Sequence, residues 1–164
     1  MMKKHKELRA MIDKIIDGVS DLVPLYLENE EDRAKSNGNL AICLIDAEGM
    51  VHGKVFGTDK IRGREAFRVA WVKASQVWIT GFKTGEYERL VFNKEIEEDR
   101  FGIRKPDYIG WEGGQPITLP GGSIVSVGVS GLRSVSDLEI VLRALDRIPG
   151  AVINNELNNI YQTI

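Results

Sequence analysis

Two segments of the sequence carry the pattern of a β-hairpin, and this pair restricts the fold more than any other feature of the chain. Residues 39–56 contain two apolar runs that are separated by Ala47-Glu48-Gly49. Residues 116–130 repeat the arrangement around Pro120-Gly121-Gly122, and valines alternate with small residues after that turn. Short glycine-containing connections of this kind join antiparallel strands. The sequence therefore predicts an antiparallel sheet built from these two hairpins.

Helical patterns flank the predicted hairpins. Apolar residues recur at helical spacing over 3–23, 64–82 and 136–148, which gives each segment one apolar face. Such a face must be buried against another element, and a sheet offers the surface for it. We therefore predict one α/β domain of the α+β kind over 1–164, with an N-terminal helix over 3–23 and a core over 39–148.

The other segments have weaker patterns. Residues 28–38 are polar and end in Asn-Gly, which predicts a solvated connection. Residues 83–115 are interrupted by glycine and proline, so we expect a short helix near 86–92 and then a functional or interface loop. The tail over 151–164 keeps a few apolar residues among its asparagines and is predicted to pack as a short helix.

Charge and cysteine content argue against several classes of protein. The formal net charge of −2 does not favour binding to nucleic acid through its phosphates. The single cysteine, Cys43, lies in an apolar run, which indicates a buried thiol in a reducing compartment. No run approaches the ~20 apolar residues that span a bilayer, and the charged N-terminus does not resemble a secretory signal. We therefore expect a cytoplasmic protein that binds neither nucleic acid nor membrane.

Few side chains are spaced for metal or nucleophile chemistry. One cysteine and two histidines, His5 and His52, cannot supply a zinc site, so no metal site is predicted. Ser130 lacks the Gly-x-Ser-x-Gly frame of a nucleophile elbow. Lys73 sits between apolar residues and is predicted to point inward and to pair with an acid such as Asp46. A buried lysine can be catalytic, although a structural ion pair is the simpler interpretation.

Basic residues mark the start of the helix predicted over 64–82. Arg62, Arg64 and Arg68 lie where a helix N-terminus favours anions, and they would strengthen a site for a carboxylate or a phosphate. Ordinary surface charge explains these side chains as well. The glycine-rich turns could present backbone N–H groups to such a ligand, or could serve only as tight turns.

Three pieces of the sequence resemble one family. The first hairpin contains LIDAEGMV, the central helix contains VKAS, and the most distinctive block is GGQPITLPGGSIVSVGVSGL followed by SDLE. On these motifs, which cover roughly 39–148, the chain resembles the GlcG/HbpS-like family, also found as the C-terminal domain of PduO-type proteins. The resemblance implies a profilin-like, three-layer α/β/α fold with a central antiparallel sheet. It also implies homo-oligomers and the binding of haem or a related tetrapyrrole, with haem degradation described for some members.

These observations favour an oligomeric protein that binds a small molecule, either a tetrapyrrole or a small organic anion. The ligand-binding residues that we predict are Arg62, Arg64, Arg68, Trp111, Gly113, Gly114, Gln115, Pro116, Ser130 and Gly131. An enzyme of haem or small-metabolite breakdown stays open as an alternative, with Lys73 and Asp46 as catalytic candidates. A structural or regulatory assembly module is a third hypothesis, in which Trp71 and Trp78 form subunit contacts. The cofactor is undecided, and haem is the candidate that the resemblance implies.

Overall fold

Helices and strands alternate along the chain much as the sequence patterns predict. The computed structural model describes residues 1–153. In chain order the elements are α1 (Met2–Tyr26), α2 (Glu30–Ser36), β1 (Leu40–Asp46), β2 (Val51–Phe56), α3 (Lys60–Thr80), α4 (Thr84–Phe92), β3 (Gly114–Thr118), β4 (Ile124–Ser130), α5 (Ser134–Ala144), a single 3-10 turn (Leu145–Arg147) and β5 (Val152–Ile153).

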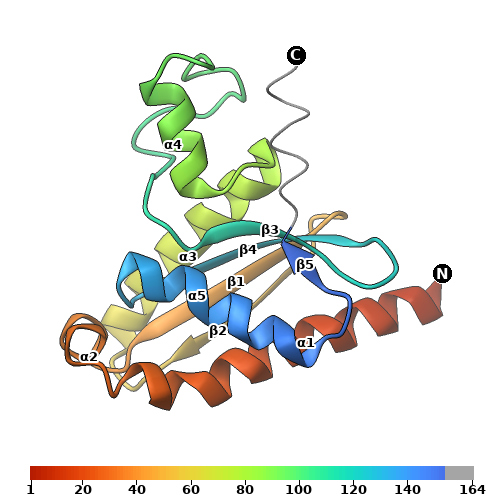
Figure 1. Ribbon diagram of the computed structural model, residues 1–164, viewed down its shortest axis with the longest axis vertical. Coiled ribbons are helices and arrows are strands. Elements are labelled where there is room, and N and C mark those ends of the chain that lie inside the picture. The colour runs from red at the N-terminus through yellow and green to blue at the C-terminus, as the bar shows by residue number, and fades with distance from the viewer. Residues whose placement is uncertain (154–164) are drawn as a thin grey trace.

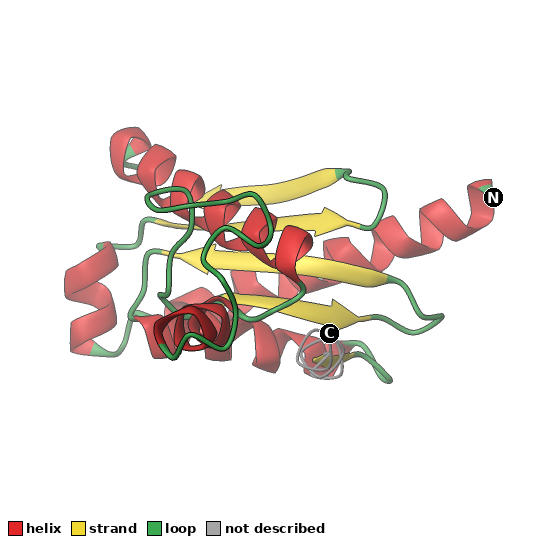
Figure 2. Ribbon diagram, turned by 90° about the horizontal axis from the view of Figure 1, so that it is seen from above, coloured by secondary structure: helices red, strands yellow, loops and turns green. Residues whose placement is uncertain are grey.

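The strands form one antiparallel sheet in the order β2-β1-β4-β3-β5. Both predicted hairpins are present, and β1 and β4 pair with each other at the centre of the sheet. Helices α1 and α5 cover one face and α3 covers the other, as Figure 1 shows, while Figure 2 looks onto the strands lying side by side. The predicted three-layer α+β fold is therefore confirmed.

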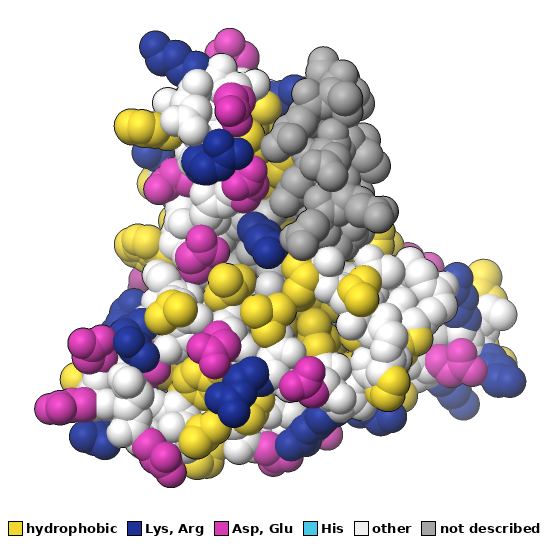
Figure 3. Space-filling view, viewed as in Figure 1, with side chains coloured by type: hydrophobic (Ala, Val, Ile, Leu, Met, Phe, Trp, Pro, Cys, Tyr) yellow, Lys and Arg dark blue, Asp and Glu magenta, His cyan; other side chains and the backbone are white. Residues whose placement is uncertain are grey.

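The larger core lies between the sheet and the pair α1 and α5. Ile12, Ile15 and Val19 lie one helical turn apart and are fully buried against apolar residues of β1, β3 and β4. All seven residues of β1 are buried, because helices cover this strand on both faces. Acidic and basic side chains alternate over the exposed side of this layer without a single-sign patch (Figure 3).

Small residues bring α3 unusually close to the other face of the sheet. Ala66, Ala70 and Ala74 pack against Ala41 and Cys43. A Cβ atom added to Gly128 would collide with the carbonyl oxygen of Ala70 and would lie 2.7 Å from the amide nitrogen of Ala74. The helix and β4 therefore meet backbone to backbone.

The tryptophans of α3 lie outside this contact. We expected Trp71 and Trp78 to lie in the core or in a subunit interface. Their side chains are 47% and 48% exposed, so the core placement is wrong. The alanines displace them, because only small side chains fit between α3 and the glycine of β4.

The segment 28–38, predicted as a solvated connection, contains α2. Asn29 caps this helix, and its Oδ1 accepts hydrogen bonds from the amides of Glu31 and Asp32 at 3.0 and 3.1 Å. The Asp32 carboxylate is buried and accepts hydrogen bonds from the Arg133 side chain and amide and from the Ser136 hydroxyl. This long-range contact fastens α2 to the first turn of α5, which is why a polar segment folds here.

Helix α4 and the loop that follows it stand away from the sheet (Figure 1). They share a small apolar cluster made of Phe82, Tyr87, Leu90, Ile96 and Tyr108. The short helix predicted near 86–92 is thereby confirmed, beginning two residues earlier at Thr84. The loop returns to the domain where Gln76 exchanges two hydrogen bonds with the backbone of Ile109.

The start of the C-terminal tail differs from our expectation of a helix over 151–164. Val152 and Ile153 form strand β5, which pairs with the edge of β3. The remainder of that prediction falls on 154–164, outside the described residues. Within the described part of the chain, no helix is both long enough and apolar enough to cross a membrane.

Candidate functional site

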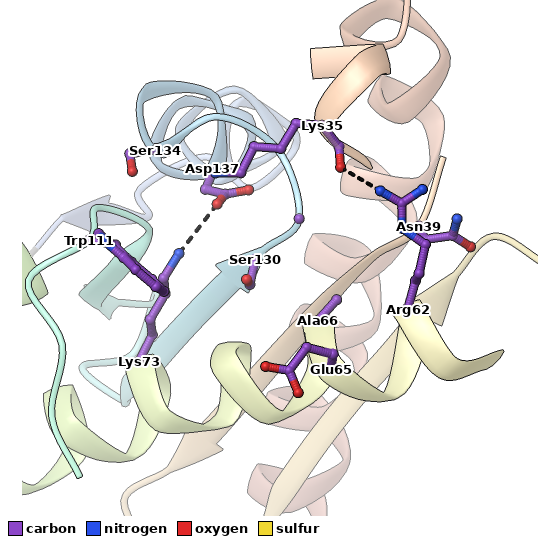
Figure 4. Close-up of a pocket in the computed structure, with 11 residues that line it drawn as sticks. Lys35, Asn39, Arg62, Glu65, Ala66, Lys73, Trp111, Ser130, Ser134 and Asp137 are labelled. Carbon is purple, nitrogen blue, oxygen red and sulfur yellow. Dashed lines mark hydrogen bonds and ion pairs between the residues drawn. The ribbon is translucent and has the colours of Figure 1, made fainter. Parts of the chain in front are cut away.

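A cavity of about 400 Å³ opens between α2, the first half of α3 and the turn from β4 to α5. We call it the lysine cavity, and Figure 4 shows the side chains around it. The residues that line it are Lys35, Asn39, Arg62, Glu65, Ala66, Lys73, Trp111, Ser130, Gly131, Ser134 and Asp137.

The floor of the lysine cavity is a buried ion pair. The Lys73 Nζ donates hydrogen bonds to the carbonyl oxygen of Val129 at 2.7 Å and to Oδ2 of Asp137 at 3.3 Å. Lys73 and Asp137 are only 1% and 2% exposed. The predicted pairing of Lys73 with Asp46 is wrong. Asp46 pairs in register with Val125, four residues along β4 from Val129, which places it roughly 13 Å away.

Burial disfavours the charge on both members of this pair. Desolvation raises the pKa of Asp137 to about 7, although the Lys73 ammonium and the amide of Leu132 oppose the shift. Desolvation also lowers the pKa of Lys73, against the attraction of Asp137 and, more weakly, of Glu112. Two groups with displaced pKa values at the floor of a cavity are typical of functional sites.

Glycines of the distinctive sequence block make room for this pair. A Cβ atom at Gly113 would lie 2.7 Å from the carbonyl oxygen of Val129 and 3.0 Å from the Lys73 Nζ, and its φ of +118° also favours glycine. A Cβ atom at Gly128 would lie 2.9 Å from the Cβ of Lys73. These glycines support the lysine and do not line the lysine cavity.

Cationic side chains surround the mouth of the lysine cavity. Arg62 donates a hydrogen bond to the backbone carbonyl of Lys35 at 2.9 Å, and the Lys35 side chain extends toward Asp137 (Figure 4). Glu65 accepts three hydrogen bonds from Arg68, at 2.6, 3.0 and 3.2 Å, which lower the pKa of Glu65. The acid at the mouth is therefore paired with an arginine that lies outside the lysine cavity.

The structure brings together only some of the predicted ligand-binding residues. Arg62, Trp111, Ser130 and Gly131 line the lysine cavity, together with the catalytic candidate Lys73. Trp111 is held in place because its carbonyl oxygen accepts a 2.6 Å hydrogen bond from the hydroxyl of Thr84.

The other predicted residues lie outside the lysine cavity. Arg64 and Arg68 are exposed on α3, while Gly114, Gln115 and Pro116 are buried in β3. The start of α3 offers no open N-terminus, because Asp59 accepts hydrogen bonds from the amides of Ile61 and Arg62. Arg62, Arg64 and Arg68 are close in sequence, but only Arg62 reaches the lysine cavity.

Six of the residues that line the lysine cavity were not predicted from the sequence, which are Lys35, Asn39, Glu65, Ala66, Ser134 and Asp137. In the sequence, Asp137 stands out only as the acid of the SDLE motif at the start of the last helix. The available signal was the buried lysine itself, because a buried ammonium requires an acidic partner.

A second cavity, of about 390 Å³, lies at the opposite end of β1 beside the turn to β2. We call it the histidine cavity, since His5 and His52 both line it together with Met50. The Nε2 of His52 is 3.5 Å from Oδ2 of Asp46, and the Nδ1 of His5 is 3.7 Å from Oε2 of Glu48. Asp46 therefore belongs to this cavity and not to the lysine cavity.

The donor types in the two cavities differ. Among the described residues that line the lysine cavity, none is a His, Cys, Met or Tyr, the side chains that hold haem iron. Cys43 is fully buried, and desolvation raises the pKa of its thiol to about 12. Residues 1–153 contain no group of three or more His, Cys, Asp or Glu arranged for a metal ion. The lysine cavity therefore does not fit haem, whereas the histidine cavity supplies suitable ligand types.

Solved structures with the same fold share little sequence with this chain. The structure of a PduOC:heme complex superposes with a TM-score of 0.56 and 16% identity over 81% of this chain and 93% of the other. Klebsiella pneumoniae protein ORFY superposes with a TM-score of 0.51 and 19% identity over 78% of this chain and 86% of the other. Protein Ybr137w superposes with a TM-score of 0.51 and 16% identity over 77% of this chain and 74% of the other. At this identity the likeness shows the fold alone. No curated protein matched the sequence.

The family assignment rests on the sequence itself. Residues 27–146, well over half of the chain, match the family described as haem degrading protein HbpS-like. The matched range includes both hairpins, α3 and every residue that lines the lysine cavity. The chain belongs to the HbpS-like family.

Proposed function

We propose that the lysine cavity binds a small organic anion. The observation that carries this proposal is the convergence of Lys35, Arg62 and Lys73 on one cavity. Glu65 is paired with Arg68, and Lys73 is paired with Asp137, so Lys35 and Arg62 supply the uncompensated charge among the lining residues. The balance of charge therefore favours an anion.

Size and polarity support the same proposal. A volume of about 400 Å³ lies within the usual range for small-molecule sites. Asn39, Ser130 and Ser134 add polar groups to the lining, and Ser134 begins α5, whose N-terminus carries a partial positive charge. Trp111, which is mostly exposed, adds an apolar side chain to the lining.

Removing one cation should weaken anion binding selectively. Small carboxylates and phosphate esters would first be compared by thermal shift, and the tightest would be measured by calorimetry. We expect Arg62→Ala to weaken its binding roughly tenfold, because a charge-assisted hydrogen bond contributes about 1.5 kcal/mol or more.

Arg64→Ala is the matched control for that measurement. It removes the same charge from the same helix, two residues away, but Arg64 does not line the lysine cavity. Its binding constant should stay within about twofold of the wild type, since distant surface charges are screened by salt. If both substitutions weaken binding equally, the anion is attracted only by the overall charge of the protein, and the proposed site would be rejected.

A second candidate function, haem binding, is favoured by the histidine cavity. The family is described as haem-degrading, and the similar PduOC structure is a haem complex. His52 and His5 are the only two histidines of the sequence, and they line this one cavity with Met50. Imidazole and thioether groups are both axial ligands of haem, and a carboxylate beside a ligating imidazole strengthens it.

A haemin titration tests this second candidate. We expect a saturable change in the Soret absorption of the wild type that is lost in the double variant His5→Ala, His52→Ala, because the iron loses its ligands. Arg62→Ala should bind haemin like the wild type. A Soret change that survives the loss of both histidines would exclude the histidine cavity as the haem site.

Self-association stays a prediction. Trp71 and Trp78 lie on one side of α3 with about half of each side chain exposed, and paired apolar groups of this kind suit a subunit contact. The enzyme alternative now concerns Lys73 and Asp137 instead of Lys73 and Asp46.

A further inference from the structure

The amino group of Lys73 combines three properties that suit a reactive amine. It lies at the floor of a cavity, it has a carboxyl group within hydrogen-bonding distance, and cations lie at the cavity mouth. We propose that Lys73 forms a reversible imine with a small anionic aldehyde or keto acid. This inference rests on the proposed function, because the same lysine cavity binds the anionic group of that compound.

The hydrogen bonds of Lys73 suit a nucleophilic amine. An ammonium group has three N–H donors, and two acceptors are placed for it, the carbonyl oxygen of Val129 and Oδ2 of Asp137. After loss of one proton, these two acceptors satisfy both remaining N–H bonds. The lone pair is then not used by either acceptor, and it is available to a carbonyl carbon in the cavity.

The buried surroundings of Lys73 favour its neutral form more than an exposed position on the protein surface would. Desolvation lowers the pKa of Lys73, and the charge of Lys35 on α2 acts in the same direction. Asp137 on α5 and Glu112 in the loop before β3 oppose the shift. Exposed lysines have no comparable desolvation, so almost all of them are protonated near neutral pH.

Asp137 can supply the proton that the reaction needs. The Lys73 nitrogen attacks the carbonyl carbon, the new C–N bond forms, and one nitrogen proton moves to the carbonyl oxygen to give a carbinolamine. The Asp137 carboxylate, which accepts a Lys73 N–H during the attack, takes up a proton from water at this stage and then donates it to the hydroxyl group. Water leaves as the C=N bond forms, and a positively charged imine remains beside the Asp137 carboxylate. A carboxyl whose pKa lies near 7 can carry out this transfer at neutral pH.

The cavity mouth selects which carbonyl compounds reach Lys73. Arg62 and Lys35 lie on the α2 and α3 side of the opening, while Lys73 and Asp137 lie at the floor (Figure 4). A compound with a carboxylate or phosphate at one end and a carbonyl at the other can contact both regions. A simple neutral aldehyde lacks the first contact.

Borohydride trapping tests the proposal, with pyridoxal 5′-phosphate as the anionic aldehyde probe. The folded protein would be incubated with the probe near pH 7.5, reduced with borohydride, digested and mapped by mass spectrometry. We expect Lys73 to carry most of the label, approaching one label per chain. The label should disappear in Lys73→Met and persist in Lys60→Met, which removes an exposed lysine of the same helix.

The wild-type map is informative even if Lys73→Met folds poorly. The rate of Lys73 labelling should rise with pH at a lower pH than the rate for a free lysine in a model peptide, as expected for the lowered pKa of Lys73. Labelling confined to exposed lysines, with Lys73 unmodified, would overturn the proposal.

Pyridoxine 5′-phosphate separates this inference from the proposed function, because it has the same phosphate but an alcohol in place of the aldehyde. Calorimetry with this compound measures anion binding alone. Binding that depends on Arg62, without labelling of Lys73 by the aldehyde, would reject imine formation and keep the anion site. Labelling of Lys73 that Arg62→Ala does not slow would keep the imine and reject the anion site.

Discussion

Lys73→Met is expected to lower the free energy of unfolding by about 3–5 kcal/mol above neutral pH, the usual effect of breaking a buried ion pair from one side. The substitution keeps the volume and the apolar stem of the side chain. It removes the donor to the carbonyl oxygen of Val129 and the cation beside Asp137. Asp137 is 2% exposed and cannot turn to water without moving α5.

The pH dependence of this loss follows from the pKa of Asp137. Because that pKa is raised from its ordinary 3.8 to about 7, the folded state retains a proton that the unfolded state has released. The stability that this proton contributes is complete below about pH 4 and is lost as pH rises through 7. Without the Lys73 ammonium the pKa of Asp137 rises further, so the variant continues to lose stability above pH 7. Urea unfolding near pH 6 and near pH 9 should show a larger deficit at pH 9.

The double variant Lys73→Met, Asp137→Asn provides the control. Asparagine keeps an oxygen that accepts the Leu132 amide hydrogen bond, which is 3.0 Å long in the wild type, but it cannot ionise. We expect it to recover much of the stability and to remove the added loss above pH 7. If Lys73→Met equals the wild type at both pH values, Asp137 is not buried against the lysine in solution.

Gly128→Ala is expected to lower the free energy of unfolding by about 4 kcal/mol or more, or to prevent folding. The added methyl would collide with the carbonyl oxygen of Ala70 and would lie 2.7 Å from the amide nitrogen of Ala74, and backbone atoms cannot move aside as a flexible side chain can. Relief requires α3 to move away from β4, which would open the core around Cys43 and displace Lys73 from Val129. Losses of this size come from a short set of causes, and overpacking is one of them.

Gly121→Ala is the comparison for that experiment. It makes the same chemical change in the turn between β3 and β4, where nothing lies within 4 Å of the new methyl. Placing alanine at a φ of +94° should destabilise the protein only through local backbone strain, by roughly 1–2 kcal/mol. Urea midpoints of the two variants should therefore differ clearly. A Gly128→Ala protein as stable as the wild type would mean that α3 and β4 do not meet backbone to backbone.

Most of the fold was predictable because its signals are local. The spacing of apolar residues over 3–23 and 64–82 predicts helices with one buried face. The glycine-containing turns predict the hairpins. Helix α2 was missed because only Asp32 and Ser36 of its seven residues are buried. Its signals were nevertheless present in the sequence, as an asparagine cap at position 29 and an acidic first turn.

The candidate site was predictable only in part. The sequence indicated that Lys73 points inward, which is correct, whereas only Arg62 of the three predicted arginines lines the lysine cavity. The acid that pairs with Lys73 was not predictable, because Asp46 and Asp137 are equally plausible until strand register is known. Register places Asp46 at one end of the β1–β4 pair and the Lys73 contact at the other.

The sequence by itself determined the element types, the antiparallel pairing within each hairpin and the inward direction of Lys73. These follow from interactions between residues close along the chain, whose geometry is nearly independent of the rest of the fold. Only the tertiary structure decided that Lys73 meets Asp137, that Lys35 and Arg62 share its cavity, and that Arg64 does not. Those contacts join segments tens of residues apart, and they depend on how closely Gly128 allows α3 to approach the sheet.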